Sequence, residues 1–200
     1  MLEINYKTIL KVALPMMGAS FIQSIVLLTD AAFLTRYNNE AFAAAGNAGL
    51  IYVSLFMIIV GMSDGAQILI SRKIGEKNYH QLGRVLSNTQ LSLLALVIVL
   101  FALSFFLLPK FIQGYAANEQ IALMQGEYLS IRSIALFFAV IQFPLQAYYF
   151  AWGRSIIPFI ATMFTAIGNI FLDYVLIFGK MGFPEMGLGG AAWASTIADG

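Results

Sequence analysis

The sequence predicts an all-α integral membrane protein, and three observations lead to this class. Hydrophobic residues make up 60% of the 200 residues and charged residues only 10%, whereas soluble domains average about 45–50% and about 25%. The mean hydropathy is +0.82. The apolar residues also form long continuous runs, whereas strands of a transmembrane barrel would alternate apolar and polar residues over stretches of about ten.

Five complete spans and the beginning of a sixth follow one another along the chain. A helix needs about 20 mostly apolar residues to cross the bilayer, and backbone amides in lipid must be paired within their own segment. The predicted spans run from about residue 9 to 35, 43 to 70, 85 to 108, 128 to 152 and 156 to 178, with an incomplete sixth from 188 to 200. Because the sixth run is only about a dozen residues long, too short to cross the bilayer, we expect the N-terminal part of a longer chain, with six helices of which the sixth is truncated.

Charge balance and missing residue types exclude several other classes. Eleven Lys and Arg against ten Asp and Glu give a net charge of +1, without the basic excess that nucleic-acid binding needs. There is no cysteine, and the single histidine, His80, cannot form a metal site alone. No nucleotide-binding or hydrolase motif is present, so we predict neither an enzyme nor a cofactor.

The distribution of Lys and Arg predicts a cytoplasmic N-terminus, because cytoplasmic connections carry an excess of these residues. In this orientation seven of them lie in inner connections and four in outer ones. The inner residues are Lys7, Lys11, Arg72, Lys73, Lys77, Arg84 and Arg154, and the outer ones are Arg36, Lys110, Arg132 and Lys180.

Carboxylates inside the predicted spans are costly there and are usually functional. Asp30 lies about 9 Å below the outer end of its span and Asp173 about 10 Å below the same end. Asn169 precedes Asp173 by one helical turn, and Ser195 or Thr196 would lie about 12 Å deep. We therefore predict a site of Asp30, Asn169, Asp173 and one hydroxyl group, whose oxygen ligands suit a proton, Na⁺ or a cationic substrate. The alternative is that each Asp only forms hydrogen bonds between helices.

Four further polar residues are candidates for an inner cavity. Asp64 lies about 12 Å from the inner end of its span, where a structural role fits equally well. Gln23 precedes Asp30 on nearly the same helix face, and Gln142 and Gln146 lie one turn apart. Hydrogen bonds between helices are the alternative for these glutamines.

Six short motifs are spread over essentially the whole chain. They are ALP at residues 13–15, TDAAFL at 29–34, GAQILIS at 65–71, YLSIR at 128–132, GNIFLDYVLIFG at 168–179 and GLGGAA at 187–192. In order and spacing they resemble the N-terminal half of the multidrug and toxic compound extrusion (MATE) transporters, within the wider superfamily that includes lipid-linked oligosaccharide flippases.

The resemblance implies the six-helix N-terminal lobe of a twelve-helix transporter in the bacterial inner membrane, with the C-terminal lobe absent. The full transporter would have a central cavity that opens alternately to either side. It implies export of small organic cations in exchange for H⁺ or Na⁺. The coupling ion would be bound by Asp30, Asn169, Asp173 and Ser195, with the first three as candidate ligands of Na⁺. Two alternatives stay open: a flippase for an anionic lipid-linked sugar, which would favour a basic cavity although only Arg132 lies near a span, and a non-transporting membrane scaffold.

Overall fold

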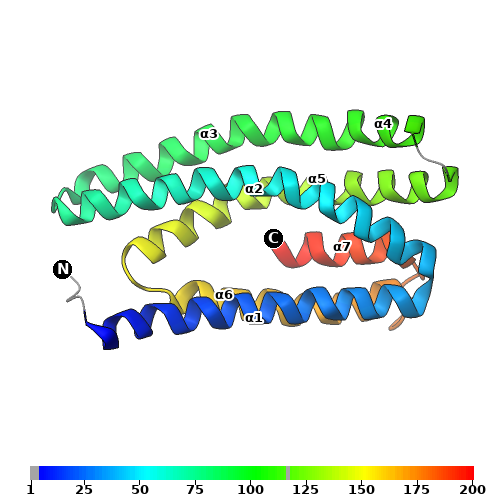
Figure 1. Ribbon diagram of the computed structural model, residues 1–200, viewed down its shortest axis with the longest axis horizontal. Coiled ribbons are helices and arrows are strands. Elements are labelled where there is room, and N and C mark those ends of the chain that lie inside the picture. Colours follow the sequence, from blue (N-terminus) through cyan, green and yellow to red (C-terminus); the bar gives the residue numbers. More distant parts are fainter. Residues whose placement is uncertain (1–4, 116–117) are drawn as a thin grey trace.

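A computed structural model describes residues 5–115 and 118–200, and all regular secondary structure in these ranges is helical (Figure 1). Five helical segments are long and apolar enough to cross a membrane, with α3, η2 and α4 forming one of them, and α7 is shorter. The elements are α1 (Tyr6–Tyr37), α2 (Asn39–Gly75), the 3₁₀ turn η1 (Tyr79–Gln81), α3 (Leu82–Ala102), the π-helical turn η2 (Leu103–Leu107), α4 (Leu108–Tyr115), α5 (Glu119–Ala151), α6 (Ile156–Ile177) and α7 (Gly187–Asp199).

The helices α1, α2 and α5 extend beyond the predicted spans. The largest difference is in α5, which begins at Glu119 rather than near residue 128. Its first residues follow Asn118, whose side chain accepts a hydrogen bond from the backbone of Ile121 at 3.2 Å. Asn38 caps α2 in the same way. Apolar runs mark the part of a helix that lies in lipid, whereas capping residues mark where the helix begins, so hydropathy alone underestimates its length.

The helices form two groups with separate apolar cores. Helix α5 packs along α2 and also contacts α3 and α4, while α1 packs along α6. The first core joins α2, α3 and α5 through residues such as Ile59, Leu93 and Leu136. The second joins the ends of α1, α2, α6 and α7 and includes Leu34 and Ile177. Helix α7 lies between the groups and contacts both α5 and α6 (Figure 1).

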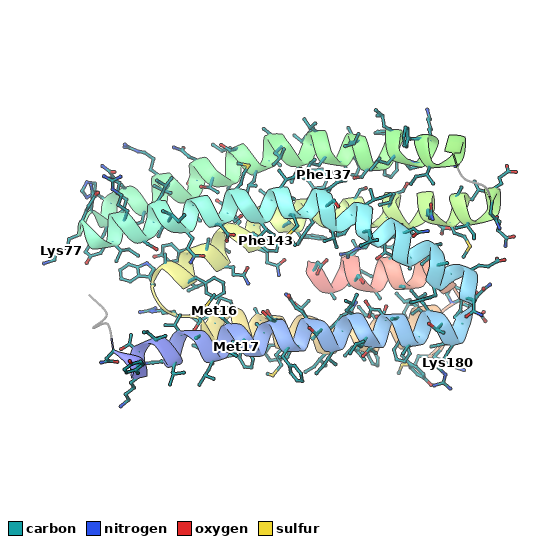
Figure 2. All side chains as sticks on the ribbon, viewed as in Figure 1. Met16, Met17, Lys77, Phe137, Phe143 and Lys180 are labelled. Atoms are coloured by element: carbon teal, nitrogen blue, oxygen red, sulfur yellow. The ribbon has the colours of Figure 1, made fainter. Side chains whose placement is uncertain are left out.

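Large apolar side chains remain exposed along the sides of the bundle. On α1, Leu14, Phe21, Leu27 and Leu28 are 60–70% exposed. Soluble monomers rarely expose continuous apolar surface on this scale. Lys77 and Lys180 lie at opposite ends of the molecule, and apolar side chains cover the length between them (Figure 2). This arrangement is that of a multi-pass membrane protein.

Because α6 and α7 lie close together at Gly190, we predict that a larger residue at this position destabilises the protein. A Cβ atom there would lie 2.7 Å from the carbonyl carbon and oxygen of Leu176, which are backbone atoms. We expect Gly190→Ala to lower the free energy of unfolding by about 1–3 kcal/mol, the usual cost of overpacking. The measurement is the midpoint of thermal unfolding of the full-length protein in detergent.

The matched control for this substitution is Gly83→Ala at the start of α3. A Cβ atom there would meet nothing within 4 Å, and the greater helix propensity of alanine predicts unchanged or slightly higher stability. An unchanged midpoint for Gly190→Ala would contradict the close packing of α6 and α7.

Candidate functional site

A cavity of about 560 Å³ lies between α1, α2, α5, α6 and α7. Its wall is mostly apolar and includes Tyr52, Phe56 and Phe143. An apolar pocket with a few convergent polar groups is the usual form of a site for small ligands. The charged side chains that line it are Asp30 from α1, Arg132 from α5 and Asp199 from α7, and they are joined by polar ones that include Asn169 from α6 and Ser195 from α7.

Asn169 links the two carboxyl groups predicted for the site. With its amide nitrogen toward them, Nδ2 donates to Asp30 Oδ1 at 3.3 Å and to Asp173 Oδ2 at 3.2 Å, and Oδ1 accepts from the Ser195 hydroxyl at 3.2 Å. The opposite orientation would keep only the contact with Ser195 Oγ, at 3.2 Å, and would turn the amide oxygen toward two acceptor groups.

The two carboxyl groups of the site, those of Asp30 and Asp173, differ in their access to the cavity. Asp30 and Asn169 line the cavity, while Asp173 is fully buried. The carboxyl groups of Asp30 and Asp173 lie within hydrogen-bonding reach of each other. Two carboxylates this close in a low dielectric can both stay ionised only when a cation compensates them; otherwise one of them takes up a proton. Among the described residues Asp173 Oδ1 has no hydrogen-bond partner, which leaves an oxygen available for such a cation.

The structure brings together the four residues of the predicted site: Asp30, Asn169, Asp173 and a hydroxyl-bearing residue. They meet because α1 packs along α6 and α7 packs closely on α6. The hydroxyl of the cluster is that of Ser195. Thr196 is buried elsewhere, and its hydroxyl donates to the carbonyl oxygen of Ile131 at 3.5 Å.

The four candidates for an inner cavity separate into two pairs. Gln23 on α1 and Gln142 on α5 line the cavity. Gln146, one turn further along α5, is half-buried outside it, and Asp64 is exposed on α2. The depth of a residue along a helix does not show which face of the helix packs against its neighbours. For Asp64 and Gln146, depth alone therefore could not show whether the side chain enters the cavity.

Arg132 lies inside the bundle, and its predicted position in an outer connection is wrong. It is well within α5 and lines the cavity, and its side chain is only 12% exposed. Its Nη1 donates to Asp199 Oδ2 at 3.0 Å, and its guanidinium carbon lies 4.5 Å from the centroid of the Tyr52 ring. These two contacts offset part of its desolvation cost.

The misplacement of Arg132 has a simple cause. An arginine beside the start of an apolar run normally marks the end of a span. The partner that indicates burial, Asp199, is 67 residues further along the chain, and nothing in the local pattern links the two residues.

Known proteins share this sequence pattern. The MatE family model matches residues 15–175. The probable multidrug resistance protein NorM of Thermotoga maritima is 30% identical, and the alignment covers 96% of this chain. The probable multidrug resistance protein YoeA of Bacillus subtilis is 26% identical over 92% of the chain. The chain spans only 41% and 40% of the lengths of these two relatives.

Solved structures share the fold. A MOP superfamily transporter from Pyrococcus furiosus superposes with a TM-score of 0.88 at 21% identity, over 96% of this chain and 42% of that protein. An outward-facing multidrug resistance MATE family transporter superposes with a TM-score of 0.85 at 21% identity, over the same shares of the two chains.

Lipid-facing helices around a charged internal cavity define a multi-pass membrane protein. This chain belongs to the MatE family, whose model matches most of its length. The predicted family and the predicted all-helical lobe are thereby confirmed.

The position of Asn169 predicts the effect of its removal. Asn169→Leu keeps the size of the side chain but leaves Asp30 and Asp173 without the amide donor between them. We expect the free energy of unfolding to fall by about 1–3 kcal/mol, the cost of leaving buried polar groups unpaired. The thermal midpoint of the full-length protein measures this loss.

A control and a second substitution make this test specific. Thr165→Val, one turn earlier on α6 and in the same cavity, should have little effect. Adding Asp30→Asn to Asn169→Leu should restore part of the lost stability, because it removes one of the two facing charges. If the double variant recovers nothing, Asn169 does not bridge the carboxyl groups.

Proposed function

We propose that the full-length protein is a secondary antiporter that exports small organic cations, including drugs, in exchange for H⁺ or Na⁺. The carboxyl pair of Asp30 and Asp173, joined by Asn169 at the wall of a cavity of about 560 Å³, carries this proposal. The names of NorM and YoeA, probable multidrug resistance proteins, support the same activity. Because the chain spans about two fifths of their lengths, the remaining part of the protein would complete the cavity.

A proton or Na⁺ would supply the positive charge that the carboxyl pair lacks. The amide of Asn169 holds the two carboxyl groups together, but it is neutral and does not cancel their charge. Among the described residues Asp173 Oδ1 has no hydrogen-bond partner, and carboxylate oxygens suit Na⁺; a proton would instead lie between the carboxyl groups. The coupling ion and a cationic substrate would then compete for the same negative charge.

An ion gradient supplies enough energy for such export. One unit charge crossing a potential of 100 mV releases about 2.3 kcal/mol, and each tenfold concentration ratio requires about 1.4 kcal/mol. One or two coupling charges therefore sustain export against a ratio of roughly ten to a thousand. Alternation between the two sides further requires that ion and substrate favour different conformations.

The alternative functions make different demands on the cavity. Arg132 is the observation that favours a flippase for an anionic lipid-linked sugar, because it lies in the cavity wall. Asp30 and Asp199 line the same cavity, however, and Asp173 lies behind it, so acidic groups outnumber the single guanidinium. This excess favours cationic cargo. A scaffold would bear the cost of a buried carboxyl pair without using it.

We place the N-terminus in the cytoplasm and the chain in the bacterial inner membrane. With Arg132 inside the bundle, the end that carries the N-terminus keeps seven Lys and Arg residues and the other end keeps three. This asymmetry, larger than the one expected from the sequence, supports a cytoplasmic location for the more basic end.

Neutralising either carboxyl group should abolish coupled export. Asp30→Asn and Asp173→Asn remove negative charge while nearly preserving side-chain size. In cells that express the full-length variants, ethidium efflux should fall to that of cells without the protein, at unchanged membrane expression. Wild-type efflux should also stop on removal of Na⁺ or on collapse of the proton gradient, which identifies the coupling ion.

The matched control for these variants is Asp64→Asn, outside the cavity, which should retain efflux. Wild-type efflux in both site variants would contradict the assigned site. An expressed wild type with no efflux under any condition would favour the flippase or the scaffold.

The absence of cysteine from this sequence makes the orientation directly measurable. Lys77→Cys and Lys180→Cys place thiols at opposite ends of the molecule (Figure 2). In spheroplasts of cells expressing the full-length protein, with any cysteine of the rest of the chain replaced, a membrane-impermeant maleimide should label Lys180→Cys. It should label Lys77→Cys only after permeabilisation. The reverse pattern would place the N-terminus outside.

A further inference from the structure

Arg132 has hydrogen-bonding capacity that the antiport mechanism does not use. A guanidinium carries five N–H donors, and one of them, on Nη1, donates to Asp199 Oδ2. Among the described residues, Arg132 Nε is buried without a hydrogen-bond partner, and so is the hydroxyl of Tyr52, whose ring lies against the guanidinium. Buried polar groups are ordinarily paired. Both residues also line the cavity, so the guanidinium has donor capacity at the cavity wall that the folded chain does not use.

The same cavity presents opposite charges to a single small molecule. Asp30, Arg132 and Asp199 all line it, on α1, α5 and α7. Arg132 is close enough to interact electrostatically with both Asp30 and Asp173. A ligand that fills the cavity would therefore contact a carboxyl group with one part and a guanidinium with another.

We propose that Arg132 and Tyr52 bind an anionic group of the same substrate whose cationic group binds at Asp30, so that zwitterions are preferred over simple cations. This inference rests on the proposed antiport function and specifies its substrate class. A guanidinium suits the task because its planar fork matches the geometry of a carboxylate. Asp199 occupies one donor of that fork and competes with the carboxylate of the substrate.

An ion pair that only fastens α5 to α7 would behave differently. Removing either partner of such a pair leaves an unpaired buried charge and weakens the protein in the same direction. In the proposed site the two residues act in opposite directions, because Arg132 attracts the anionic group of the substrate and Asp199 repels it.

Rhodamine 123 and rhodamine 110 are matched probes for this difference. The first is the methyl ester of the second, so a single carboxylate distinguishes a monocation from a zwitterion. Fluorescence anisotropy measures the binding of each to the purified full-length protein. The wild type should bind rhodamine 110 more tightly than rhodamine 123.

We expect substitutions at Arg132 and Asp199 to affect the binding of rhodamine 110 differently from that of rhodamine 123. Arg132→Gln should weaken binding of rhodamine 110 roughly tenfold or more, the effect of losing one charge-assisted hydrogen bond, and should leave rhodamine 123 unchanged or bound more tightly. Asp199→Asn should strengthen binding of rhodamine 110 and weaken that of rhodamine 123. Arg154→Gln, exposed at the turn between α5 and α6, is the control that should change neither affinity.

Three results would overturn the inference. They are a wild type that prefers rhodamine 123, an Arg132→Gln variant that weakens both probes equally, and an Asp199→Asn variant that weakens rhodamine 110. If Arg132→Gln does not fold, Asp199→Asn decides alone, because a structural pair and a substrate site predict opposite changes for rhodamine 110. Failure of the wild type to bind either probe would instead overturn the proposed function, whereas weaker binding of both probes by Asp30→Asn would support it.

Discussion

The rest of this structure depends on holding two carboxyl groups together inside a bundle whose sides face lipid. Asp30 comes from α1 and Asp173 from α6, two helices that pack along each other. An uncompensated carboxylate in an apolar interior is very costly, and two side by side also repel. The amide of Asn169 donates to both carboxyl groups, and in the proposed function an exchangeable cation would compensate their charge. The stability of the contact between α1 and α6 would then depend on what the site holds.

Close backbone packing gives this site its geometry. Gly190 lets α7 approach the backbone of α6, and Gly187, at a φ of +53°, begins α7 against the ring of Tyr37 at the end of α1. Without a Cβ atom at these two positions, α7 can lie near enough for Ser195 to reach Asn169 at 3.2 Å. The short distances within the polar cluster therefore depend on the spacing of the helices. Contacts at glycine residues, which carry no charge, set that spacing.

The relative level of two residues on neighbouring helices could be predicted from the sequence, whereas the rotation of each helix about its axis could not. Counting residues from a charged helix end, at 1.5 Å each, places Asp30 and Asp173 at one level, and the structure brings them into contact. The same counting could not show that Asp64 is exposed, because the face a helix buries depends on its neighbours. Arg132 marks a second limit: its partner Asp199 is 67 residues away, and a tertiary contact of this kind leaves no local pattern.

The carboxyl pair and the ion pair in the cavity wall are linked through α7. The Ser195 hydroxyl donates to Asn169 Oδ1 at 3.2 Å, and the amide of Asn169 donates to Asp30 and Asp173. Ser195 lies on α7 one turn before Asp199, the partner of Arg132. In the proposed function the coupling ion would bind at the carboxyl pair and the substrate would face the ion pair. The two sites would then share one helix, so a change of occupancy at one has a short path to the other.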